Sequence, residues 1–128
     1  MSSLSDRFRD AVLCRDHPAM VEALAPEVVF NSPVAFLPFE GRDTVGEVLG
    51  AVMETFEDFR YTDELAGETA HALVFKARVG PKDVEGIDLL RFDAEGRIRD
   101  FTVLVRPLSG TIALAEAMGP KVAHLKGR

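Results

Sequence analysis

The first part of the chain repeats apolar residues at helical spacing. Residues 4–15 present one apolar face, and Ser3 or Ser5 can cap the start of this helix. A second, short helix is predicted within residues 16–26, where Pro18 suits the first turn.

The clearest helical pattern runs from Asp43 to about Phe56. Apolar residues recur there at intervals of three and four: Val45, Val48, Leu49, Val52, Met53 and Phe56. Thr44 and Glu47 have the spacing of a capping box at its start. A short strand, Val28–Asn31, precedes this helix.

After residue 56 the pattern changes to the alternation that is typical of strands. Four strands are predicted, over residues 59–65, 69–79, 84–92 and 98–106. Turn residues separate them, so we expect an antiparallel meander. A last helix is predicted over residues 109–118, ending at Gly119 and Pro120.

Helices followed by a run of long strands predict the α+β class, with a cone-shaped, curved antiparallel sheet wrapped around three N-terminal helices. We expect one domain over residues 1–128, because the chain is long enough for a single core. The core is expected over about residues 4–118, and residues 119–128 are expected to form a solvated basic tail.

Charge and composition narrow the classes of partner. The net charge is −6, which argues against nucleic acid and anionic membranes as partners. No apolar run approaches membrane-spanning length, and the N-terminal MSSLSDRFRD is charged where a signal peptide needs an apolar core. We therefore expect a cytoplasmic protein.

Cysteine and histidine offer little chemistry. Cys14 is the one cysteine, and its place in a helical pattern predicts a buried, inert thiol. The three histidines show no metal-ligand spacing, so no metal and no cofactor are expected. His71 is predicted either at the edge of a cavity or as a capped surface residue at the start of a strand.

Asp88 is out of place in the apolar strand VEGIDLLRF, residues 84–92. A carboxylate there is costly unless it is paired or its pKa rises until it is neutral. One interpretation is a structural Asp88 that is shielded by Asn31, Ser32, His71 or Arg91. The other is that Asp88 is the polar working group of an apolar pocket, as a candidate acid or hydrogen-bond donor.

Strand alternation predicts what would surround an inward-facing Asp88. The expected ligand-binding residues are Phe8, Phe30, Phe36, Phe39, Phe56, Phe75, Leu90, Phe101, Val103 and Val105. Residues 34–42 form a loop rich in apolar residues, which either folds under the body or lines a cavity mouth. Such a pocket suits a flat hydrophobic ligand with a carbonyl or hydroxyl group.

The opposite face of the sheet is also partly apolar. It is predicted to carry Ile87, Leu89, Ile98 and Leu104, interleaved with Arg91, Asp100 and Thr102. A monomer would expose these side chains, so a homodimer through the outer sheet face is expected.

The order of elements resembles the nuclear transport factor 2-like superfamily, in its ketosteroid isomerase and SnoaL-like polyketide cyclase branch. The resemblance rests on GRDTVGEVL, which opens the third helix, and on IDLLRFDAEGRIRDFTVLV, which forms the last hairpin. It extends from Phe8 to Leu108 and implies a cone that encloses an apolar pocket, commonly in a homodimer. The fold hosts enzymes and binding proteins alike, so it implies no single activity.

The resemblance also assigns positions. Residues 87–92 match the I-D-x-x-R-F motif of the isomerases. In those enzymes the acid of the motif donates a hydrogen bond to the substrate oxyanion, so the resemblance implies that role for Asp88. Ketosteroid isomerase is the established example of such a neutral acid. The position of their general base holds Ser32, and that of their oxyanion-hole tyrosine holds Phe8. A positioned base contributes about 10²–10⁴-fold, so steroid isomerisation by that mechanism is not expected.

Three hypotheses follow. The first is a protein that binds a small apolar ligand of polyketide, steroid or terpenoid type, with acid–base isomerisation, cyclisation or dehydration centred on Asp88. The second is a non-catalytic binding or carrier module. The third is a dimeric interaction scaffold, which a pocket much smaller than ~300 Å³ would favour.

Overall fold

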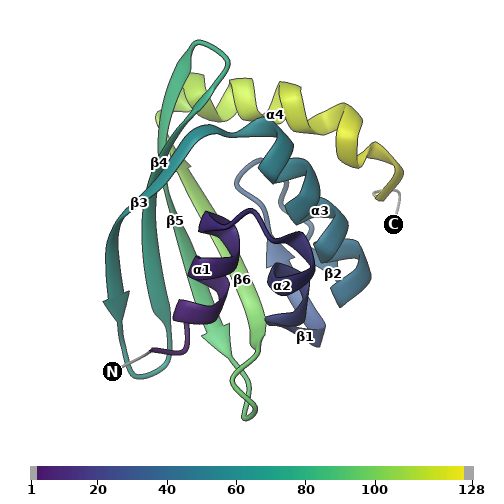
Figure 1. Ribbon diagram of the computed structural model, residues 1–128. Coiled ribbons are helices and arrows are strands. Elements are labelled where there is room, and N and C mark those ends of the chain that lie inside the picture. The colour runs from purple at the N-terminus through teal and green to yellow at the C-terminus, as the bar shows by residue number, and fades with distance from the viewer. Residues whose placement is uncertain (1–2, 126–128) are drawn as a thin grey trace.

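The computed structural model describes residues 3–125, which form one curved six-stranded sheet with helices packed on its concave side (Figure 1). The strands are β1 (Leu24–Asn31), β2 (Phe39–Glu40), β3 (Glu57–Ala66), β4 (His71–Val79), β5 (Lys82–Phe92) and β6 (Ile98–Arg106). The helices are α1 (Asp6–Leu13), α2 (His17–Glu22), α3 (Arg42–Thr55) and α4 (Leu108–Val122), followed by the 3-10 turn η1 (Ala123–Leu125). The predicted α+β class is confirmed.

The sheet has the order β2-β1-β6-β5-β4-β3. Strands β3 to β6 form the predicted antiparallel meander. Strand β1, however, runs parallel to β6, with Phe30 opposite Phe101, and β2 forms within a segment predicted as loop. The prediction of a wholly antiparallel sheet is therefore wrong at this edge. Local patterns do not reveal this pairing, because β3, β4 and β5 lie between β1 and β6 along the chain.

Alternation along β4 and β5 decides which side of the sheet meets the helices. Every second residue of β4 from His71 to Val79 is buried, and on β5 the same holds from Val84 to Leu90. Only one face of the sheet is covered by helices, so alternate side chains enter the core while their neighbours face outward. This alternation places Asp88 on the core side.

Helix α3 crosses the concave face and begins one residue earlier than predicted. Its N-cap is Gly41, whose φ of +94° suits glycine, and no side chain caps it, so the predicted Thr44–Glu47 capping box is wrong. The start is held instead by Arg42, whose Nε donates to the Leu24 carbonyl at 3.0 Å. This bond ties α3 to the beginning of β1.

Helix α4 continues past Gly119 and Pro120, where the prediction ended it. Val122 and Leu125 are buried, and this burial offsets the hydrogen bond that Pro120 cannot donate. Lys121 donates to Thr55 Oγ1 on α3 at 3.0 Å. Residues 119–125 are therefore helical and not a fully solvated tail, because Val122 and Leu125 are buried, whereas Lys126 and Arg128 lie outside the described residues.

Helix α1 ends at Leu13, two residues earlier than predicted, and this shortening exposes Cys14. The prediction of a buried thiol is wrong, because Cys14 is the C-cap residue and no longer shares the apolar face of the helix. Within residues 3–125, no helix is long and apolar enough to cross a membrane.

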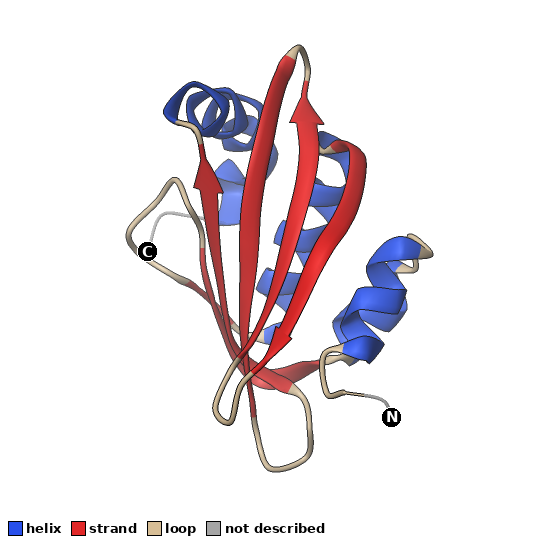
Figure 2. Ribbon diagram, turned by 90° about the vertical axis from the view of Figure 1, so that its left-hand side faces the viewer, coloured by secondary structure: helices blue, strands red, loops and turns tan. Residues whose placement is uncertain are grey.

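The convex face of the sheet has no helix of the described chain over it (Figure 2). Its centre is a patch of neighbouring side chains on β4, β5 and β6, here called the outer sheet patch: Ala72, Val74, Ile87, Leu89, Thr102 and Leu104. Leu104 is 54% exposed. Ile98, predicted on this face, is fully buried, because the register between β5 and β6 shifts after Arg91.

Candidate ligand-binding cavity

A cavity of about 400 Å³ lies between α3 and the concave face of the sheet. From α3 and its C-cap residue it is lined by Val48, Leu49, Val52, Met53 and Phe56, and from the sheet by Phe30, Phe75, Asp88, Phe101 and Val103. Its volume falls within the range of small-molecule sites and above the limit that would favour a closed scaffold.

The structure brings most of the predicted ligand-binding residues to this cavity. Those in its lining are Phe8, Phe30, Phe39, Phe56, Phe75, Phe101 and Val103, together with Asp88 and Ser32. Leu90 is instead packed in the core, Val105 is half-buried outside the lining, and Phe36 is 97% exposed. The loop of residues 34–42 is divided between these outcomes, since Val34 and Ala35 line the cavity whereas Phe36 and Leu37 project into solvent.

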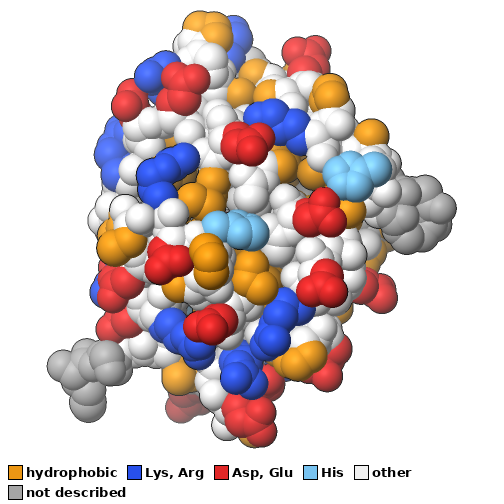
Figure 3. Space-filling model, turned by 45° about the vertical axis from the view of Figure 1, so that its right-hand side comes forward, with side chains coloured by type: hydrophobic (Ala, Val, Ile, Leu, Met, Phe, Trp, Pro, Cys, Tyr) orange, Lys and Arg blue, Asp and Glu red, His pale blue; other side chains and the backbone are white. Residues whose placement is uncertain are grey.

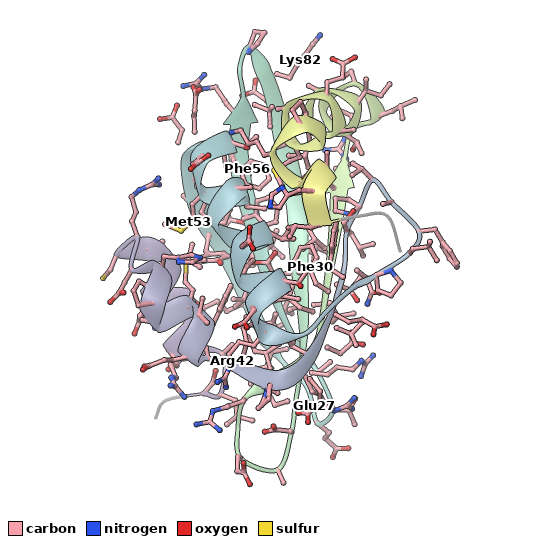
Figure 4. All side chains as sticks on the ribbon, turned by 90° about the vertical axis from the view of Figure 1, so that its right-hand side faces the viewer. Glu27, Phe30, Arg42, Met53, Phe56 and Lys82 are labelled. Atoms are coloured by element: carbon pink, nitrogen blue, oxygen red, sulfur yellow. The ribbon has the colours of Figure 1, made fainter. Side chains whose placement is uncertain are left out.

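The exposed lining residues lie on two sides of α3. On one side, Leu13 ends α1, Arg15 follows it, and Glu57 and Asp58 begin β3. On the other side, Val34 belongs to the loop after β1. Figure 4 shows α3 between these regions, with Met53 on the side of α1. The cavity therefore passes beneath α3 and approaches the surface on both sides.

Arg15 and Asp58 lie where the cavity approaches the surface beside α1, here called the α1-side entrance. Both have a positive φ of 54° without being glycine. Such conformations are uncommon and need support from their surroundings. Arg15 Nη2 donates to the Met53 carbonyl at 3.1 Å, and Asp58 Oδ2 accepts a bond from Arg78 Nε at 2.8 Å. These bonds hold the backbone at the entrance.

Asp88 lies at the middle of β5, opposite Leu73 on one neighbouring strand and Val103 on the other. Its side chain faces the cavity, and the residue is only 7% exposed. Burial raises the pKa of Asp88 to about 7, although a hydrogen bond from Tyr61 opposes the rise. At neutral pH the carboxyl is therefore populated in both protonation states.

The groups considered as shields for Asp88 bond elsewhere. Asn31 donates to Thr102, and Arg91 to Thr69. His71 is buried, its Nδ1 lies 3.1 Å from Ser5 Oγ, and its ring meets Phe92 edge-on. His71 is thus neither at the cavity nor at the surface, and both predictions for it are wrong. It is buried beneath the start of α1, where it bonds the N-cap residue Ser5.

The partner of Asp88 is Tyr61, which sequence reasoning missed. Its hydroxyl donates to Asp88 Oδ2 at 3.2 Å, and burial, followed by the nearby carboxylate, holds the pKa of Tyr61 well above its usual value. Tyr61 lies on β3, a strand in which most side chains are exposed. The signal that could have found it is the alternation of Phe59 and Tyr61 among charged residues.

Ser32 and Phe8 both lie in the cavity lining. The Ser32 hydroxyl oxygen accepts bonds from the backbone N–H groups of Val34 and Ala35, each at 3.1 Å. Phe8 packs edge-on against Phe101 at a centroid distance of 5.1 Å. Ser32 is therefore a turn-forming residue without basic character, and Phe8 contributes only apolar surface.

On the helical side of the molecule, acidic and basic side chains are intermingled (Figure 3), so this face has no extended field of one sign. Within residues 3–125, no group of three or more His, Cys, Asp or Glu side chains is arranged to hold a metal ion.

Comparison with known proteins agrees with this fold. The family profile described as a SnoaL-like domain matches residues 6–101. A crystal structure of a steroid delta-isomerase from Pseudomonas aeruginosa is 41% identical over 94% of this chain and 90% of that chain, with a TM-score of 0.88.

Two further structures are similar. An uncharacterised protein with a cystatin-like fold from Silicibacter pomeroyi is 34% identical over 96% of this chain and 87% of that chain, with a TM-score of 0.90. A protein with a ketosteroid isomerase-like fold from Catenulispora acidiphila, in complex with trimethylamine, is 14% identical over 88% and 92% with a TM-score of 0.67, and shows the fold alone. No curated protein matched. The chain belongs to the SnoaL-like domain family, within the nuclear transport factor 2-like superfamily that its order of elements predicts.

Proposed function

We propose that the protein binds a small, flat, apolar molecule of polyketide, steroid or terpenoid type in the cavity beneath α3, and that Asp88 exchanges a proton with its carbonyl or hydroxyl group. The observation that carries the proposal is the position of Asp88, a buried carboxyl that faces an apolar cavity and has a pKa of about 7. An acid poised near neutral pH is suited to general acid–base work.

The chemistry that this site supports is a cofactor-independent proton transfer, such as isomerisation, cyclisation or dehydration. In its neutral form Asp88 donates a hydrogen bond to a ligand carbonyl, and in its ionised form it accepts a proton. Because Asp88 is buried, this hydrogen bond is stronger than in solution. The similarity to a steroid delta-isomerase makes a β,γ-unsaturated 3-ketosteroid the first molecule to test.

The second candidate function is a carrier without turnover. It is favoured by Ser32, which stands where the isomerases have their base and whose oxygen is already engaged by two backbone amides. Asp88 would then only orient the polar group of the ligand.

The experiment compares the protein with Asp88→Asn and with Asp83→Asn, which changes an exposed carboxylate on the same strand. Binding of 2-naphthol, a flat aromatic alcohol, is measured by fluorescence titration, and conversion of the ketosteroid is followed by ultraviolet absorbance. We expect Asp88→Asn to weaken naphthol binding about tenfold, the scale of one hydrogen bond to a charged group, and Asp83→Asn to leave it unchanged.

The outcomes separate the candidates. Conversion by the wild-type protein that Asp88→Asn abolishes supports an enzyme, whereas weakened binding without any conversion by either protein supports a carrier. Naphthol binding that is the same in all three proteins would contradict a ligand site at Asp88.

We also propose that the outer sheet patch pairs with a second copy of the chain. Its apolar centre is bordered by both signs of charge, with Arg106 and Glu85 3.1 Å apart on one side and Arg91 opposite Asp100 on the other. A two-fold contact requires a surface that complements itself, and a patch of mixed charge around an apolar centre meets that requirement.

A further inference from the structure

Tyr61 and Asp88 come from strands that are not neighbours. Tyr61 lies on β3 and Asp88 on β5, and β4 runs between them. The phenol nevertheless reaches Asp88 Oδ2 at 3.2 Å, and its ring is held edge-on against Phe59 at a centroid distance of 5.0 Å. Tyr61 and Asp88 are both part of the cavity lining.

The two carboxyl oxygens of Asp88 have different surroundings. Oδ2 accepts the bond from Tyr61, whereas no hydrogen bond from the described residues reaches Oδ1. Within residues 3–125, Arg97 Nε is the only side-chain nitrogen or oxygen that is both sealed from solvent and without a hydrogen-bond partner. Asp88 Oδ1 has no partner either, so it is not sealed, and open space lies beside it. That space belongs to the cavity, because Asp88 lies in its lining.

We infer that Tyr61 is a positioning residue for Asp88: its hydroxyl fixes Oδ2 and leaves Oδ1 as the oxygen that meets the ligand. This inference rests on the proposed function, since it assigns the ligand contact to one oxygen of the same carboxyl. The ligand oxygen is then bound by a carboxyl group that cannot rotate freely, which lowers the entropic cost of alignment.

Tyr61 also affects which form of Asp88 is present. A hydrogen bond that Tyr61 donates to Oδ2 stabilises the carboxylate and works against the effect of burial on the pKa of Asp88. Tyr61 itself keeps its proton at neutral pH, because its own pKa is raised. The protonation change therefore occurs at Asp88 alone, and the site accepts a ligand carbonyl when Asp88 is neutral and a ligand hydroxyl when Asp88 is ionised.

The test follows the carboxyl carbon of Asp88 by NMR as a function of pH, in protein labelled with ¹³C-aspartate and without any ligand. Asp88→Asn identifies the signal. We expect Tyr61→Phe, which keeps the ring and removes the hydroxyl, to move the midpoint of the Asp88 titration upward by about one pH unit. Thr62→Val is the control: it removes a hydroxyl from the next residue of β3, which is exposed and bonds Asp63, and it should leave the midpoint in place.

An unchanged midpoint in Tyr61→Phe, or an equal shift in Thr62→Val, would overturn the inference. Because no ligand is present, the result is independent of the binding test with Asp88→Asn. A failure of the Tyr61 assignment can therefore be distinguished from a failure of the proposed ligand site.

Discussion

The ring of Phe75 lies over Gly86 on the neighbouring strand, so close that a Cβ on Gly86 would stand 2.4 Å from the ring atom Cζ. The Phe75 ring fits there because Gly86 has no side chain to occupy the same space. Phe75 in turn stacks on Phe59 at a centroid distance of 5.0 Å and forms part of the cavity lining. One glycine on β5 thus shapes an aromatic wall that continues onto β3.

Gly86→Ala is expected to destabilise the protein by about 3 kcal/mol, because the new methyl group meets both the Phe75 ring and the backbone oxygen of Leu104. Gly119→Ala is the control, since no atom lies within 4 Å of a Cβ there; its stability should stay within about 1 kcal/mol of the wild type. Urea denaturation measures both. Equal stability of the two variants would contradict the close approach at Gly86.

Asp88 should make the protein less stable as the pH rises. The pKa of Asp88 is about 7 when folded, against 3.8 for the ordinary group, so the folded state binds more protons than the unfolded state between these values. The stabilisation relative to Asp88→Asn is therefore complete below about pH 4 and is lost as the pH rises through 7, by about 4 kcal/mol in all.

The measurement is the free energy of unfolding of both proteins at several pH values between 4 and 8. Taking the difference between wild type and Asp88→Asn removes the contribution of the other carboxylates. A difference that stays constant with pH would show that Asp88 is ionised in the fold.

Ser32→Asp tests why the isomerase mechanism is not expected. A carboxylate oxygen can accept the backbone bonds of Val34 and Ala35 as the hydroxyl does, and it adds a base. We expect the conversion of a β,γ-unsaturated 3-ketosteroid to rise about 10²-fold or more. Ser32→Asn has the same shape without basicity, so equal rates for the two variants would argue against this position as that of a base.

Leu104→Glu should weaken the proposed dimer. Leu104 is half-exposed in the outer sheet patch, and a charge there is costly to bury against a second copy. Leu108→Glu is the control, because Leu108 is also exposed but belongs to α4. Analytical ultracentrifugation of the wild type, Leu104→Glu and Leu108→Glu measures the oligomeric state of each. A monomeric wild-type protein would contradict the dimer.

Local patterns were sufficient to predict the class of fold and the orientation of Asp88. The alternation along β4 and β5 is a property of neighbouring residues, and it correctly separates the core side from the outer side. It fails where the register shifts: Ile98 enters the core after such a shift, and another follows Tyr61 on β3. The bond between Tyr61 and Asp88 could not be predicted, because it spans an intervening strand.

The ends of the helices show a second limit of prediction from local sequence patterns. Gly119 and Pro120 resemble a stop signal, yet α4 continues because Val122 and Leu125 find an apolar surface to pack against. The position of Cys14 depends on where α1 stops, which is decided by packing and not by the spacing of apolar residues. Tertiary contacts determined both outcomes.

The parallel pairing of β1 with β6 also has a consequence for how the protein folds. Asn31 and Thr102, bonded across this pair, are 71 residues apart, whereas the strands from β3 to β6 follow one another through short turns. Contacts of high sequence separation form late and slow the search for the native state. The meander is expected to assemble first, and the cavity is enclosed only when β1 and α3 dock, so an apolar ligand would find its site only in chains that have completed this last step.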